Sequence, residues 1–123
     1  MYERILVGTD GSSTAAKAVD QAVVVAQSLG ATLTIFSAAT AAKGDKAVAK
    51  DAARHESSGV AISTKVVDTD PVSGLVAEAA SGGFDLLVMG NKGMTGLTRF
   101  LKGSVPNKVA HHLPCSLLIV KTT

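Results

Sequence analysis

Aromatic residues are nearly absent from this sequence: they make up 3% of its 123 residues, and none of them is tryptophan. The apolar fraction is nevertheless 46%, and it consists mostly of alanine, valine and leucine. Small side chains of this kind are typical of helices that lie close against a sheet rich in Val, Ile and Leu. Because charged residues amount to only 18%, the composition excludes a disordered chain and predicts a packed core.

Cysteine and long apolar runs are also scarce. The single cysteine, Cys115, excludes an internal disulfide framework and agrees with a reducing compartment. No apolar run approaches the roughly 20 residues that a membrane-spanning helix needs. Residues 1–5 lead directly into an apolar run and lack the layout of a signal peptide. We therefore expect a cytoplasmic protein of one domain, residues 1–123, with no membrane partner.

Acidic residues are missing from the last third of the chain, where none follows Asp85. Residues 1–85 hold seven Lys/Arg against ten Asp/Glu, a charge of −3, and the remaining residues carry +5. This asymmetry favours an anionic partner near the C-terminal third. Chance segregation of charge on a solvated face explains it equally well. Basic and aromatic residues do not interleave as in nucleic-acid-binding proteins, so no nucleic-acid partner is expected.

Apolar runs and helical patterns alternate along the whole chain. Strands are predicted at the apolar runs 5–7, 32–36, 64–67, 86–89 and 117–120. Helices are predicted between them: from Ser12 or Ser13 to residue 29, over 45–57, over 71–81, and from Ser104 to Pro114. This alternation predicts an α/β fold, a doubly wound five-stranded parallel sheet with helices on both faces. Ligands of such sheets bind beyond the C-terminal ends of the strands, where the strand order reverses.

The stretch 37–59 has the weakest pattern. Its predicted helix, 45–57, contains only Val48 as a large apolar residue, so we expect it to bury little surface. His55 lies within this helix, and nothing in the sequence indicates a partner for it.

A glycine-rich loop between Gly90 and Ser104 follows the fourth predicted strand and precedes a predicted helix. Glycines remove Cβ atoms where a backbone turns sharply or approaches a ligand. The N–H groups of such a turn, together with the N-terminus of the following helix, attract an anion. Local positive charge comes from Lys92, Arg99 and Lys102. The loop therefore predicts a phosphate site, with a purely structural turn as the alternative. Neither a P-loop nor a Gly-x-Gly-x-x-Gly fingerprint is present.

The spacing Gly90-x2-Gly93-x9-Gly103-Ser104 resembles the nucleotide-binding signature of the universal stress protein family. The opening Ile-Leu-Val-Gly-Thr-Asp-Gly-Ser, residues 5–12, resembles the first strand and turn of the same family. The likeness spans nearly the whole chain. It implies a single universal stress protein domain, 1–123, with a Rossmann-like fold of the adenine nucleotide alpha hydrolase type. It also implies binding of ATP or a related adenine nucleotide, and many members of the family are homodimers.

The resemblance assigns a role to each matching position. The phosphates would lie against Gly90, Gly93, Gly103 and Ser104, with backbone contacts from Met89 and Val105. Thr9 would line the adenine side, and Asp10 would contact the ribose or a phosphate-bound Mg²⁺. Ser37, or its neighbour Ala38, takes the position after the second strand where the family usually offers an apolar residue to the base.

Asp10 also has an argument of its own. An acidic residue at the C-terminal end of a strand, beside a phosphate site, suits a hard cation or a sugar hydroxyl. The alternative is an Asx turn with Gly11 and Ser12, in which the carboxylate serves only the local backbone. The sequence leaves both interpretations open.

Three classes of function follow. The first is an adenine-nucleotide-binding protein, with ATP and Mg²⁺ favoured, that senses or buffers the nucleotide in stress or signalling. Cyclic AMP or AMP is the alternative ligand, because the similar branch of the family includes cyclic-AMP binders. The second class is a homodimeric interaction module with an empty pocket, paired through the last strand, Leu117 to Lys121. The third is an enzyme that uses Asp10 and Mg²⁺. At most slow ATP hydrolysis is expected, since no general base or arginine finger is identifiable.

Overall fold

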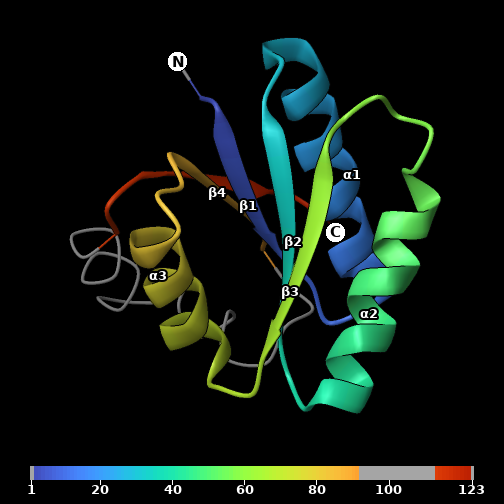
Figure 1. Ribbon diagram of the computed structural model, residues 1–123, viewed down its shortest axis with the longest axis vertical. Helices are drawn as coiled ribbons and strands as arrows, with labels where there is room; N and C mark the ends of the chain where they lie inside the picture. The colour runs from blue at the N-terminus through green and yellow to red at the C-terminus, as the bar shows by residue number, and fades with distance from the viewer. Residues whose placement is uncertain (1, 92–112, 123) are drawn as a thin grey trace.

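The computed structural model describes residues 2–91 and 113–122 (Figure 1). One sheet of five parallel strands is formed by β1 (Arg4–Gly8), β2 (Thr32–Ala38), β3 (Ile62–Val67), β4 (Leu86–Gly90) and β5 (Ser116–Val120). The helices within the described residues are α1 (Ser13–Leu29), α2 (Ala41–Arg54) and α3 (Pro71–Ser81). The predicted α/β fold with a parallel sheet is confirmed. The helix predicted from Ser104 lies outside the described residues.

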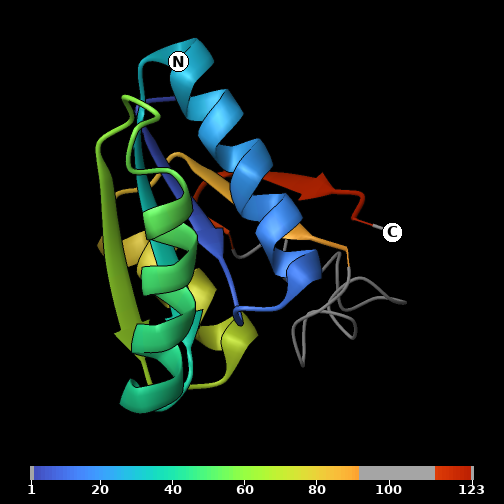
Figure 2. The same ribbon diagram turned by 90° about the vertical axis from the view of Figure 1, so that its right-hand side faces the viewer.

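The helices cover the sheet in two layers. Helices α1 and α2 lie on one face, and α3 lies on the other (Figures 1 and 2). Side chains alternate along the strands, so Ile5 and Val7 of β1 join the core under α1, while Leu6 joins the core under α3. Each strand of the sheet centre is thus buried on both faces, which explains why β1 and β4 read as continuous apolar runs. Within the described residues, no helix combines the length and apolar character needed to cross a membrane.

The strand order is β3-β2-β1-β4-β5. The chain starts in the middle of the sheet, builds outward through β2 to β3, and then returns to add β4 and β5 on the other side of β1. The order therefore reverses between β1 and β4, which pair with Val7 opposite Val88. A ligand site is expected beyond the carboxyl ends of these two strands.

Two helices begin and end at the residues that their sequences predict. At the start of α1, Ser12 Oγ accepts the N–H of Ala15 at 3.1 Å, and Gly30 ends the helix in the left-handed region with φ 65°. At the start of α3, Asp70 Oδ2 accepts the N–H of Ser73 at 3.1 Å, and Pro71 occupies the first turn. These caps hold both helices at fixed ends relative to the sheet.

The predicted bounds of α2 are wrong. The helix begins at Ala41 and ends at Arg54, rather than covering 45–57. It packs on β2 and β3 through small side chains, because Gly44 comes so close to the sheet that a Cβ built there would lie 2.2 Å from Val66 Cγ1. A helix that approaches this closely needs few large apolar residues, so the periodicity of large side chains gives a poor signal.

Gly44→Ala is expected to lower the free energy of unfolding by about 1–3 kcal/mol, because the added methyl overlaps Val66. Helix propensity acts in the opposite direction, favouring Ala by roughly 1 kcal/mol. Urea denaturation followed by circular dichroism decides which effect is larger. A Val66→Ala background removes the 2.2 Å overlap and leaves only the Cβ of residue 66, at 3.2 Å, so the same substitution should cost much less there. A stabilised Gly44→Ala single variant would contradict the close contact of α2 with β3.

Candidate functional site

The structure brings four of the predicted site residues together at the carboxyl edge of the sheet. Thr9 and Asp10 directly follow β1, and Met89 and Gly90 are the last two residues of β4. Because β1 and β4 are paired neighbours, these residues flank the point where the strand order reverses. The other residues assigned to the phosphates and their flank lie outside the described residues: Gly93, Gly103, Ser104 and Val105.

Thr9 is fully buried, and its hydroxyl is used within the protein. Thr9 Oγ1 donates to Oδ2 of Asp51 at 2.6 Å and accepts the N–H of Gly11 at 3.1 Å. Its backbone N–H donates to the carbonyl of Phe36 at 2.9 Å. Thr9 therefore holds the turn after β1 in place, and its contact with an adenine ring stays a prediction.

Asp10 is exposed, and it makes the local turn that the sequence offered as an alternative. Its Oδ1 accepts the N–H of Ser12 at 2.9 Å, which is an Asx turn. Oδ2 accepts no hydrogen bond from the described residues. The part of the chain that is described has no group of three His, Cys, Asp or Glu residues placed to hold a metal ion. A Mg²⁺ ion bound at Asp10 would take this one carboxylate as its protein ligand. Its other ligands would be phosphate and water oxygens.

Ser37 does not follow the second strand, contrary to the prediction. It lies inside β2, opposite Val66 of β3, and is 1% exposed. Ala38 also belongs to β2, so the residues that follow the strand are Ala39 and Thr40. The prediction used the apolar run 32–36, which is only the most hydrophobic part of the strand. The strand continues to Ala38 because it stays paired with β3 up to Val67.

A polar network that the sequence did not reveal lies behind the β1 turn. Asp51 of α2 is buried, and its second carboxylate oxygen accepts from Arg54 Nη1 at 2.6 Å. Arg54 Nη2 also donates to Asp20 of α1 at 2.6 Å, and His55 Nε2 lies 2.6 Å from the same oxygen. The partner of His55, which could not be identified from the sequence, is Asp20. The i,i+3 spacing of Asp51 and Arg54 was the one signal available, and the contacts with Thr9 and Asp20 required the folded chain.

Asp20 shows the electrostatic effect of this network. Partial burial raises the pKa of its carboxyl group, but the hydrogen bonds and positive charge of Arg54 and His55 outweigh burial, and the net pKa is lowered. A carboxyl group with a lowered pKa in the folded state contributes stability above its unfolded pKa. This contribution is lost as the pH falls through the lowered folded value.

A pocket of about 340 Å³ lies between the β1 turn and α2. Its lining consists of Asp10, Gly11, Lys43, Lys46, Ala47 and Lys50. Gly11 has a φ of 83°, and a Cβ at this position would lie 3.2 Å from the Cβ of Ala47, so the turn and the helix are in close contact. Lys50 Nζ donates to the Gly11 carbonyl at 3.2 Å and so joins α2 to the turn. We call this site the basic pocket.

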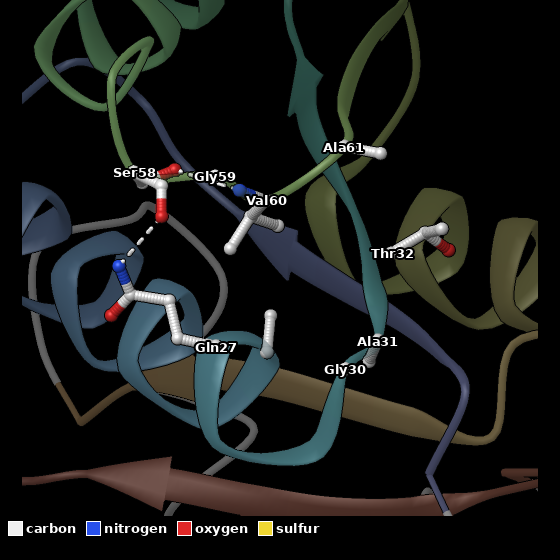
Figure 3. A pocket seen from close by; sticks show the side chains of 9 residues that line it. Gln27, Gly30, Ala31, Thr32, Ser58, Gly59, Val60 and Ala61 are labelled. Atoms are coloured by element: carbon white, nitrogen blue, oxygen red, sulfur yellow. Dashed lines mark hydrogen bonds between the residues drawn. The ribbon is translucent and has the colours of Figure 1, made fainter.

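A second pocket, of about 480 Å³, lies at the opposite edge of the sheet (Figure 3). Its lining comes from the end of α1, the start of β2 and the turn before β3, and includes Gly30, Ala31 and Val60; none of the lining residues in the described part of the chain is charged. The side chain of Gln27, from α1, lies along one side of this pocket, and its Nε2 donates to the carbonyl of Ser58 at 3.0 Å. Because it lies at the amino ends of the strands, it is remote from the predicted site.

Asn91, in the glycine-rich loop, serves the fold. Its Oδ1 accepts the N–H and the hydroxyl of Thr122, both at 2.9 Å, and Lys17 Nζ donates to the carbonyl of Thr122 at 3.1 Å. The end of β4 is thereby fastened to the residues after β5 and to α1. These bonds fix the backbone at the start of the glycine-rich loop, beside the strand reversal. A phosphate site built from backbone N–H groups needs a fixed backbone of this kind.

The chain is similar to known proteins over nearly its whole length. The model of the Universal stress protein family matches residues 1–44 and 37–121. A universal stress protein of Mycobacterium tuberculosis is 31% identical over 144 residues, which cover 99% of this chain and 98% of that protein. One of Methanocaldococcus jannaschii is 29% identical over 141 residues, covering 98% and 83%. A crystal structure of a universal stress protein in complex with cAMP is 36% identical, with a TM-score of 0.82 over 99% of this chain and 98% of that one.

Proposed function

Because this chain belongs to the universal stress protein family, we propose that it binds an adenine nucleotide across the reversal between β1 and β4. The observation that carries the proposal is the placement of Thr9 and Asp10 beside Met89 and Gly90 at the carboxyl edge of the sheet. This is the position at which doubly wound sheets bind nucleotides. The protein would act as a sensor or buffer of the nucleotide in stress or signalling.

The proposed site divides into a phosphate end and a base end. Gly90, Gly93, Gly103 and Ser104 would bind the phosphates, with backbone contacts from Met89 and Val105. Thr9 and Ser37 would lie toward the base, as buried residues that shape its pocket from below. Asp10 would contact the ribose or, for ATP, a phosphate-bound Mg²⁺ through the carboxylate oxygen that the Asx turn leaves unused.

Cyclic AMP is the second candidate ligand. A universal stress protein of known structure that is 36% identical to this chain is in complex with cAMP. A cyclic monophosphate needs no metal ion, so it would use the glycine loop without Asp10 acting as a metal ligand. ATP with Mg²⁺ remains our first proposal, because the Asp10 carboxylate oxygen that the Asx turn leaves unused suits a phosphate-bound metal ion.

Calorimetric titration of nucleotide-stripped protein with ATP–Mg²⁺, AMP and cyclic AMP tests this proposal. We expect saturable binding, and we expect Gly103→Val to weaken it at least 100-fold, because a side chain where backbone approaches a phosphate excludes the ligand. Ala80→Val is the control for added bulk, since Ala80 is exposed near the end of α3, at the amino edge of the sheet and away from the site. Circular dichroism verifies that both variants fold.

A homodimer is proposed as the assembly. β5 is an edge strand, and its Leu118 and Ile119 are 38% and 42% exposed. Apolar edge strands need cover, and a second copy could supply it through Leu117 to Lys121.

Sedimentation of the calorimetry samples separates the classes of function. A dimer that binds none of the three nucleotides would contradict nucleotide binding and support the interaction module instead.

A further inference from the structure

The basic pocket presents several ammonium groups to one cavity. Lys43, Lys46 and Lys50 lie at i, i+3 and i+7 of α2, so they follow one another along one side of the helix. All three line the same cavity of about 340 Å³, together with the turn that carries Asp10. This volume lies at the lower end of the range for small-ligand sites, roughly 300–1,000 Å³.

The charges of this cavity are unbalanced. Against the three lysines stands one carboxylate among the described lining residues, that of Asp10. Lys50 is held by the carbonyl of Gly11, which carries no full charge. Lys43 and Lys46 form no ion pair with any residue among 2–91 and 113–122. Like charges that line one cavity repel one another, and a multivalent anion relieves this repulsion.

We propose that the basic pocket binds a polyphosphate group through Lys43 and Lys46, with Lys50 beside them at the Gly11 carbonyl. An ammonium group is a compact donor suited to phosphate oxygens, and a chain of phosphates can reach several of them at once. The group could be a free inorganic polyphosphate or the triphosphate of a nucleotide. The second source places the triphosphate in this pocket instead of on the glycine loop, so it does not depend on the proposed nucleotide site. A cyclic monophosphate carries too little negative charge to gain affinity from several lysines at once.

The experiment titrates the full chain with inorganic tripolyphosphate, ATP and cyclic AMP at low salt without Mg²⁺. The double variant Lys43→Gln/Lys46→Gln should bind tripolyphosphate and ATP about tenfold or more weakly, while its affinity for cyclic AMP stays within about twofold. Lys43→Arg/Lys46→Arg keeps both charges and should retain most of the affinity. As a control for long-range charge, Lys65→Gln removes a lysine that pairs with Glu78 of α3, on the other face of the sheet.

The outcomes separate the two proposals. The basic pocket is overturned if tripolyphosphate and ATP fail to bind the wild-type chain, if the double variant binds both unchanged, or if Lys65→Gln weakens them as strongly. If the variant loses tripolyphosphate but the wild-type chain binds no nucleotide either with or without Mg²⁺, the basic pocket stands and the proposed nucleotide site fails. A loss for ATP identifies the nucleotide triphosphate as an occupant, and a loss for tripolyphosphate alone identifies free polyphosphate.

Discussion

Asp51→Ala should lower the free energy of unfolding by about 2–4 kcal/mol, a large effect for one polar residue. Asp51 is fully buried, and its two oxygens accept from Thr9 Oγ1 and from Arg54 Nη1, each at 2.6 Å. Removing the carboxylate leaves a buried hydroxyl without its acceptor and takes one of two carboxylate partners from the guanidinium group. Urea denaturation monitored by circular dichroism measures the loss.

Two companion variants separate the contributions. Asp51→Asn preserves the size of the side chain and an acceptor for Thr9, so it should cost less than Asp51→Ala. Thr9→Val removes only the hydroxyl, and combining it with Asp51→Ala should cost less than the sum of the two single effects. Additive effects would show that the Thr9–Asp51 hydrogen bond contributes nothing by itself. An Asp51→Ala variant as stable as wild type would contradict the network as a whole.

Phe36→Ala should lower the free energy of unfolding by about 3–5 kcal/mol, the cost of emptying a well-packed core site. Phe36 is 1% exposed and belongs to the core under α3, with Leu6, Leu75 and Met89. Gly74 of α3 faces the ring and has no side chain with which to fill the space, since a Cβ built there would lie 3.3 Å from the ring. The cavity therefore remains in the folded state.

Thermal and urea denaturation of Phe36→Ala, Phe36→Leu and Val24→Ala test this expectation. Phe36→Leu retains most of the volume and should cost clearly less than Phe36→Ala. Val24 lies on α1 and is 51% exposed, so its truncation should change stability by less than about 0.5 kcal/mol. If Phe36→Ala and Val24→Ala had equal effects, the core under α3 would not be packed as described.

Much of the fold could be predicted from the sequence because buried parallel strands and capped helices leave local signals. The runs in β1 and β4 are apolar on both faces, and Ser12, Gly30 and Asp70 take the capping positions their residue types favour. A helix was predicted where α2 lies, but its bounds were wrong because its contact with the sheet depends on the absence of a side chain at Gly44. Periodicity methods count large apolar residues and cannot register a contact of that kind.

The candidate site, too, could be predicted only where its residues leave a local signal in the sequence. Asp10 could be placed at the carboxyl edge because it directly follows an apolar strand, and the structure locates it there with Thr9. The partners of Thr9 could not be found, since Asp51 is 42 residues away in sequence and contacts it only after α2 packs. The basic pocket was also not predicted. Lysines three or four residues apart usually indicate a solvated helix face, and only the packing of α2 brings them beside the turn after β1.

The strand order has a consequence for synthesis of the protein. β1 pairs with β2 early in the chain, whereas its partner on the other side, β4, places Leu86 opposite Ile5 across a long intervening segment. Closing so long a loop is entropically costly, and the ribosome releases β1, β2 and β3 before it makes β4. Until then one edge of β1, whose Ile5, Leu6 and Val7 are fully buried in the folded protein, stays unpaired. We expect the nascent chain to be most prone to aggregation, and to need chaperones most, in the interval between the emergence of β3 and the docking of β4.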